Sequence, residues 1–119
     1  MEKINLREKY SLFSDFWSPK IIGELNGQFV KLAKFQGEFV WHAHAYEDEL
    51  FMVIQGTLRL EFRDKTVIVN ENEMIIVPKG VEHRPSADEE VWVMLFEPKE
   101  TLNTGNTRSA FTKENLEWI

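Results

Sequence analysis

The chain has 119 residues and contains no cysteine. Disulfide bonds, thiolate metal sites and thiol nucleophiles are therefore excluded, and any bound metal would need nitrogen and oxygen ligands. No window approaches the ~18 consecutive apolar residues of a membrane span, and the opening MEKINLREKY has no apolar run of the signal-peptide kind. We therefore expect a cytoplasmic protein.

Positive charge is also scarce in this chain. Lysine and arginine number 14 against 20 acidic residues, for a formal net charge of −6. Such a balance disfavours nucleic acid and anionic membranes as partners, so we expect neither. The 43% hydrophobic and 13% aromatic content can fill one core, and the length leaves no room for a second domain.

The middle of the chain consists of short apolar runs separated by turn-forming residues, which is typical of an all-β protein. Asn26-Gly27 separates Ile21–Leu25 from Gln28–Phe35 and predicts a tight hairpin, because both turn residues tolerate positive φ. Breaks are expected at Gln36-Gly37 and over Pro85–Asp88. Further strands are predicted over Glu38–His44, Leu50–Ile54, Thr57–Phe62, Thr66–Val69, Met74–Val77 and Val91–Glu97. This spacing favours a β-sandwich or a small barrel.

The two ends of the chain each predict a short helix. Asn5 can cap a helix that contains Leu6 and Tyr10, and Thr112 can cap a second helix over Lys113–Trp118. We therefore divide the chain into an N-terminal arm at residues 1–20, a β-barrel at residues 21–98 and a C-terminal tail at residues 99–119.

The stretch WHAHAYEDEL contains two of the three histidines. On a strand, the i, i+2 spacing of His42 and His44 places both imidazoles on one face, about 7 Å apart. Imidazole suits borderline divalent metals, and a carboxylate would complete a mixed site. Glu49 is best placed for this because it leads into the next apolar strand, whereas Glu47 and Asp48 are expected to be solvated turn acids. Alone, the stretch is more typical of a polar surface strand.

The third histidine follows a second turn. In PKGVEH, Pro78 and Gly80 predict a tight turn that leads to His83. Together the two stretches resemble the motifs of the cupin superfamily, approximately G-x5-H-x-H-x3/4-E-x6-G and G-x5-P-x-G-x2-H-x3-N. The first motif corresponds to Gly37, His42, His44, Glu49 and Gly56, with one residue fewer than the pattern between Gly37 and His42.

The second motif departs from the family pattern at its two ends. It corresponds to Pro78, Gly80 and His83, but Asn72 replaces the leading glycine and Ala87 replaces the closing asparagine. Asparagine tolerates positive φ nearly as glycine does, so the first departure is mild. Neither departure removes a ligand.

The resemblance implies a jelly-roll barrel, or double-stranded β-helix, that binds one divalent metal. The ligands would be His42, His44, Glu49 and His83, with one or two positions left for water or substrate. Such a ligand set suits Mn, Fe, Co, Ni or Zn without ranking them. The family also implies a homodimer, because cupins commonly pair through their sheets, and the apolar N-terminal arm supports that expectation.

The resemblance leaves the reaction open. Small cupins include dioxygenases, isomerases, lyases and decarboxylases, so it implies a small-molecule substrate and a metal-dependent enzyme of undefined type. A non-catalytic module that binds a metal or a small ligand is the alternative. A structural β-sandwich with incidental histidines is the third.

Residues that would line a pocket follow from strand alternation. If His42 and His44 point inward, Val40 does too, and from Glu49 onward so do Phe51, Val53 and Gln55. Trp92, Met94 and Phe96 are further pocket candidates, with core packing as the alternative. Tyr46 lies beside the ligands, where a phenol could act as an acid, a base or a hydrogen-bonding group, unless it is a simple loop aromatic.

Overall fold

The Asn26-Gly27 turn forms the hairpin that the sequence predicts. In the computed structural model, which describes residues 1–119, their φ angles are 51° and 77°. These left-handed values are those that a two-residue hairpin needs. The turn joins β1 (Lys20–Leu25) to β2 (Gln28–Glu38) as an antiparallel pair, with Leu25 opposite Gln28.

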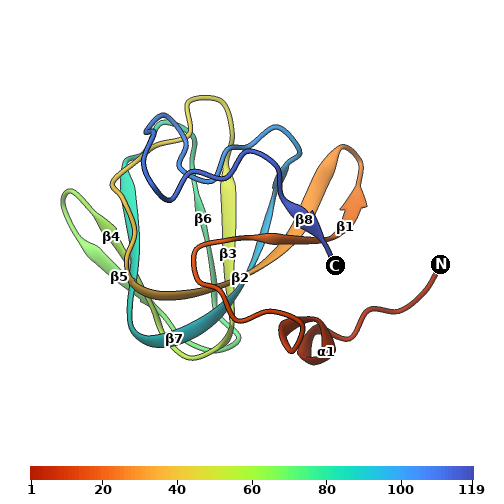
Figure 1. The fold of residues 1–119 in the computed structure, drawn as a ribbon. Coiled ribbons are helices and arrows are strands. Elements are labelled where there is room, and N and C mark those ends of the chain that lie inside the picture. Colours follow the sequence, from red (N-terminus) through yellow and green to blue (C-terminus); the bar gives the residue numbers. More distant parts are fainter.

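Strand β7 (His83–Pro98) closes the sheet into a barrel. Its first residues pair with β4 (Leu58–Phe62), its last residues pair with β3 (Glu49–Gln55), and β2 runs beside both parts. β5 (Thr66–Val69) continues from β4, and β6 (Met74–Val77) continues from β3. Because one bent strand belongs to both groups, the strands enclose a common interior (Figure 1). The predicted all-β barrel is confirmed.

Alternation along the strands decides which side chains fill this interior. Along β7, Val91, Val93 and Leu95 are buried, and the residues between them are only half-buried. Leu58 and Leu60 on β4 show the same alternation. Alternate residues of each strand therefore point into the core. Any functional side chain in the interior must occupy one of these inward-facing positions.

Two predicted breaks lie inside strands. Gln36-Gly37 is a β-bulge within β2, where the register shifts after Phe35, and Gly37 adopts a φ of 82°. Residues Pro85–Asp88 continue β7, since Ser86 pairs with β2 on one side and β4 on the other. Their turn-forming composition was misleading because pairing with both neighbouring strands outweighs local preference.

The N-terminal arm begins with the predicted helix and packs on its own barrel. Asn5 Oδ1 accepts a hydrogen bond from the Glu8 amide at 3.0 Å and caps α1 (Leu6–Tyr10). Tyr10 is fully buried, stacks on Trp92 at 4.7 Å and donates its hydroxyl to the Val93 carbonyl. Part of the apolar surface of the arm is thus covered within the chain itself.

The predicted helix over Lys113–Trp118 is wrong. The Thr112 side chain, its expected cap, instead accepts from the Ser109 amide at 3.0 Å and bonds the Thr104 hydroxyl at 2.7 Å. The chain then extends, and β8 (Glu117–Trp118) pairs in parallel with β1. The open edge of β1 offers hydrogen-bond partners to the backbone N–H and C=O groups of this segment. An isolated helix of only six residues would be less stable.

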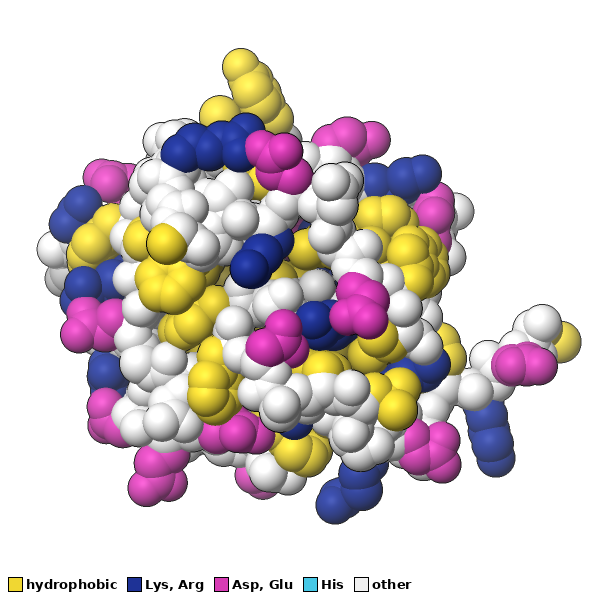
Figure 2. Space-filling view, viewed as in Figure 1, with side chains coloured by type: hydrophobic (Ala, Val, Ile, Leu, Met, Phe, Trp, Pro, Cys, Tyr) yellow, Lys and Arg dark blue, Asp and Glu magenta, His cyan; other side chains and the backbone are white.

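The surface shown in Figure 2 mixes acidic and basic side chains, and no histidine is visible on it. All three histidines are buried. None of the helices is long and apolar enough to cross a membrane.

Candidate metal centre

His42 and His83 lie side by side because their backbones pair. The His42 amide donates to the His83 carbonyl at 3.1 Å, and the His83 amide donates to the His42 carbonyl at 2.9 Å. The predicted strand over Glu38–His44 is wrong beyond Glu38, where β2 ends. The Phe39 amide still donates to the Pro85 carbonyl at 3.0 Å, and the bridge at His42 follows. The bridge brings the two imidazole centroids to 4.3 Å, and the His44 ring follows at 5.0 Å from His42.

Backbone carbonyls orient two of the imidazoles. Nδ1 of His42 donates to the Val40 carbonyl, and Nδ1 of His83 donates to the Val81 carbonyl, each at 2.9 Å. Such bonds fix the tautomer and leave Nε2 with its lone pair free. Nε2 of His83 is buried without a hydrogen-bond partner.

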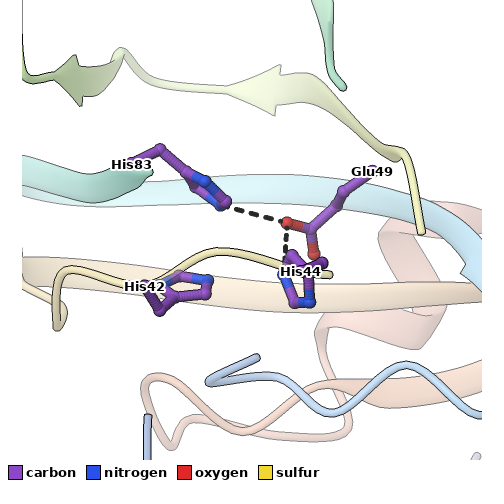
Figure 3. Close-up of side chains that lie close together, drawn as sticks. All are labelled: His42, His44, Glu49 and His83. Carbon is purple, nitrogen blue, oxygen red and sulfur yellow. Dashed lines mark hydrogen bonds and ion pairs between the residues drawn. The ribbon is translucent and has the colours of Figure 1, made fainter. Parts of the chain in front are cut away.

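Glu49 completes the group from the opposite side. It is the first residue of β3, and its Oε1 lies 3.1 Å from Nε2 of His44 and 3.4 Å from Nε2 of His83 (Figure 3). The ligand atoms of His42, His44, Glu49 and His83 all lie within 4.8 Å of one another, and all four residues are buried. The structure thus brings together the four residues that the sequence singles out.

The two loops that carry the motifs are tied to each other. The Gly80 amide donates to the His44 carbonyl at 2.8 Å, and the Lys79 amide donates to Oδ1 of Asp48 at 2.9 Å. Asp48 is therefore a loop-bracing residue as well as an exposed turn acid. Asn72 has a φ of 67°, which is the left-handed conformation that asparagine tolerates better than most non-glycine residues.

Burial and neighbouring charges set the ionisation of the group. Burial opposes ionisation of Glu49, but its contacts with His44, His83 and Glu97 outweigh that effect and hold its pKa well below the ordinary value. Burial, followed by the charge of His83, lowers the pKa of His42 from 6.5 to about 4. At neutral pH the site therefore offers a carboxylate and a neutral imidazole, which are the protonation states that bind a metal.

We expect the lowered pKa of His42 to make the metal-free protein less stable in acid. Its stabilising contribution is complete above the unfolded value of 6.5 and is lost as pH falls through about 4. The loss amounts to about 3 kcal/mol, since one pKa unit corresponds to about 1.4 kcal/mol. The measurement is the free energy of unfolding in urea, with chelator present, for wild type and His42→Gln from pH 7 to pH 4. The difference between the two proteins should become smaller as the pH falls.

The comparison with His42→Gln is needed because another group acts in the opposite direction. Burial, and then the charge of Glu49, raises the pKa of Glu97 well above its ordinary value, so Glu97 favours the folded state as pH falls. Because Glu97 is present in both proteins, its contribution cancels from the difference between their unfolding free energies. A difference in unfolding free energy that stays constant over this range would contradict the prediction.

A small cavity adjoins the cluster. The space open to the centre of a water molecule is about 20 Å³, where about 10–15 Å³ suffices for one water. His42 and Glu49 form part of its wall, and several aromatic rings form another part. The lining residues are Trp17, Pro19, Phe35, Phe39, His42, Glu49, Phe51, Pro85, Leu95, Glu97 and Asn103.

Of the predicted pocket residues, only Phe51 lines this cavity. Val53 is buried in the core, Val40 is half-buried against it, and Gln55 is exposed at the end of β3. Trp92, Met94 and Phe96 have the outward parity of β7, opposite to that of Val91, Val93 and Leu95. Tyr46 is 88% exposed and does not line the cavity, so the structure offers no support for an acid or base role.

Sequence reasoning missed Glu97 and its partner Lys31. Both are only 1% exposed, and Nζ of Lys31 donates to Oε1 of Glu97 at 2.7 Å. The available signal was parity, because Glu97 continues the inward series Val91, Val93, Leu95. A charged residue in such a series is a candidate for the site.

Gly105 in the C-terminal tail presses against the histidine segment. The tail crosses one end of the barrel beside that segment (Figure 1), where the Asn106 amide donates to the Ala43 carbonyl at 3.0 Å. A Cβ on Gly105 would lie 2.3 Å from the Ala43 carbonyl oxygen and 3.1 Å from Cδ2 of His42. Only glycine therefore lets the tail approach this closely.

We expect Gly105→Ala to weaken metal binding about tenfold, because the residues between His42 and His44 would have to move. Gly27→Ala is the matched control, since Gly27 also has positive φ but has nothing within 4 Å of the added Cβ. Both variants should lose about 1 kcal/mol of stability from backbone strain. Competition titration against a chromogenic chelator measures the affinities, and equal affinities in the two variants would refute the prediction.

The donor set fits a divalent metal ion. Three imidazoles and one carboxylate converge, and the buried, unpartnered Nε2 of His83 is explained by a ligand that accepts its lone pair. Without an ion this atom would lose its hydration and gain no partner. The arrangement can hold one cation with an adjoining cavity on the side of His42 and Glu49.

Comparisons with known proteins agree with the motifs. The family profile described as "Cupin domain" matches residues 28–97. A crystal structure of a cupin-2 domain protein from Shewanella frigidimarina is 50% identical, with a TM-score of 0.80 over 81% of this chain and 94% of that one. A protein from Neisseria meningitidis is 32% identical, with a TM-score of 0.76 over 82% of this chain and all of the other.

A curated relative is an uncharacterised protein of Bacillus subtilis, YdbB. It is 41% identical over 80 residues, which are 66% of this chain and 65% of that protein. The match thus spans slightly less than two thirds of the relative, and neither its description nor those of the two structures names a reaction.

Proposed function

Because this chain belongs to the cupin domain family, we propose that it binds one divalent metal and acts as an enzyme on a small-molecule substrate. The observation that carries the proposal is the convergence of four buried ligand atoms within 4.8 Å beside a cavity. His42, His44, Glu49 and His83 are the proposed ligands. Mn, Fe, Co, Ni and Zn all suit them.

The protein residues have separate tasks in this proposal. A bound cation would supply Lewis-acid polarisation of a carbonyl or hydroxyl, or activation of water or dioxygen. The Val40 and Val81 carbonyls hold the imidazoles of His42 and His83 in the ligating tautomer. The aromatic wall, including Phe39 and Phe51, excludes bulk water and strengthens electrostatic interactions inside.

Metal analysis followed by a turnover screen tests the proposal. Protein expressed without added metal, or reloaded after chelation, should contain about one metal per chain by mass spectrometry. Metal-loaded protein should then consume a member of a panel of keto acids, sugars and diketones, with or without oxygen. The Glu49→Ala variant should consume no member of the panel. Wild type without stoichiometric metal would overturn the proposal.

A non-catalytic binding module is the second candidate. The smallness of the cavity favours it, because a space of about 20 Å³ holds little more than one water-sized group. Stoichiometric metal with ligand-dependent spectral changes, but no turnover across the panel, is the result that would select the binder.

We also propose a homodimer. The outward face of β6, β3 and β7 carries adjacent apolar rows, with Ile76, Leu50 and Phe96 in one and Met74, Met52 and Met94 in the next. Ile76 and Met74 are exposed, and single proteins rarely leave such a surface uncovered. Sedimentation equilibrium should give twice the chain mass, and a monomer would contradict the proposal.

A further inference from the structure

A second hollow, here called the tail groove, lies on another side of His44. It runs between the loop that follows the histidines, with Tyr46 and Glu47, and the start of the C-terminal tail, with Glu100 and Leu102. The space open to the centre of a water molecule is about 250 Å³, against about 20 Å³ in the aromatic cavity. The tail groove can therefore hold a molecule of several non-hydrogen atoms, which the cavity cannot.

His44 presents a ring nitrogen to this groove. Its Nε2 lies 3.1 Å from Oε1 of Glu49, on the side of the proposed metal (Figure 3). Nδ1 points the other way and has no partner in the chain, although Nδ1 of His42 and Nδ1 of His83 each bind a backbone carbonyl. The ring belongs to the tail groove and not to the aromatic cavity.

This nitrogen also keeps contact with solvent, although His44 is only 3% exposed. The side-chain polar atoms that are shut off from solvent without a partner belong to His83, Glu97 and Thr101. Nδ1 of His44 is not among them, so it is reached from the groove that its ring lines. A histidine that binds metal normally gives its second nitrogen a partner, and here a ligand of the groove can be that partner.

The charges of the groove favour a cation. Glu47 is half-buried, Glu100 is exposed, and neither takes part in any of the ion pairs of the structure. No lysine or arginine lines the groove. Leu102 and the ring of Tyr46 add apolar surface between and beside the two acids. Such a wall attracts small cations and repels anions.

We propose that the tail groove binds a small organic cation that carries an oxygen atom, such as an alkylamine with a hydroxyl or ether group. Its ammonium group pairs with Glu47 and Glu100, and its oxygen forms a hydrogen bond with Nδ1 of His44. Carboxylic acids of the same size are disfavoured because the two acidic side chains repel them.

The proposed metal decides which role Nδ1 takes. A neutral imidazole carries one hydrogen. With a metal on Nε2, that hydrogen is on Nδ1, which donates to the oxygen of the ligand. Without a metal, Nε2 can donate to the Glu49 carboxylate, and Nδ1 is then an acceptor. An ether oxygen accepts but cannot donate, so its contribution to binding should need the metal. This coupling rests on the proposed function.

Three small molecules of nearly equal shape test the proposal. 3-Methoxypropylamine has both the ammonium group and the oxygen, 3-methoxypropan-1-ol lacks the charge, and pentylamine has a methylene group in place of the oxygen. Amide chemical shifts of the zinc-loaded protein report binding without turnover, and those of Gly105 and Asn106, which line the groove, should move. We expect 3-methoxypropylamine to bind about tenfold tighter than either of the others. Removal of zinc should weaken its binding and leave that of pentylamine unchanged.

Charge reversal at the rim of the groove provides the second arm. Glu100→Lys should weaken the binding of 3-methoxypropylamine about tenfold or more, because a repulsion replaces an attraction. Glu89→Lys is the matched control, since Glu89 is also exposed and does not line the groove. The control should bind as wild type does. Substitution of an exposed side chain seldom affects folding, so both variants should be folded.

The outcomes separate the groove from the metal. Wild type that binds no zinc would overturn the proposed function, and the charge preference of the groove can then be measured in chelator. An amine that binds no tighter than the alcohol, or that binds Glu100→Lys as well as wild type, would overturn the inference. Equal binding of 3-methoxypropylamine and pentylamine to the zinc-loaded protein would overturn the role of His44.

Discussion

Replacing His83 with alanine is expected to abolish tight metal binding while leaving a folded protein. His83 contributes one of the four converging ligand atoms, and its Nε2 lacks any other partner. Loss of an outer-sphere residue already lowers metal affinity about 10–100-fold, so loss of a ligand should cost about 100-fold or more. Metal content after dialysis and chelator competition give the measurement.

A second measurement separates ligation from stability. Metal binds only the folded state, so it should raise the unfolding midpoint of wild type in proportion to the logarithm of its concentration. The midpoint of His83→Ala should be insensitive to metal. Thr101→Val, which alters a buried polar residue outside the cluster, should keep both the affinity and the metal-dependent midpoint. If His83→Ala kept the wild-type metal content, the histidines would be incidental.

The four clustered residues could be singled out because their two stretches together resemble the cupin motifs. The i, i+2 histidines, the acid that opens the next apolar run and the histidine after a Pro-Gly turn can all be recognised in the sequence. The backbone that joins them was not predictable. His42 and His44 lie in an irregular segment beyond the end of β2 at Glu38, with one bridge to His83.

The pocket was less predictable than the ligands. The sequence did not decide which alternate residues of β7 face inward, and the pocket candidates Trp92, Met94 and Phe96 have the outward parity. The large residues face outward, where the N-terminal helix covers Trp92 through Tyr10. Trp17 and Asn103 come to the cavity from the two ends of the chain, and no periodicity could indicate such a long-range contact.

Replacing Lys31 alone should be strongly destabilising. Lys31→Met leaves the Glu97 carboxylate buried, opposite Glu49 and without its cation, and breaking a buried pair in this way costs about 3–5 kcal/mol. The free energy of unfolding in urea, measured in chelator at pH 7, should fall by that amount. A loss below about 1 kcal/mol would contradict the prediction and show that Glu97, whose pKa is already raised by burial and by Glu49, takes up a proton instead.

The double variant Lys31→Met/Glu97→Leu should recover most of this loss, because apolar side chains of similar volume often replace a buried ion pair at little cost. The interaction energy from the two single variants and the double variant should therefore be large. An ion pair that stability does not require needs another reason to stand in the interior. If the double variant is as stable as wild type but binds metal more weakly, that reason is the metal site, because Glu97 and Glu49 line the same cavity. If it is stable and binds metal as tightly as wild type, Lys31 and Glu97 stabilise only each other.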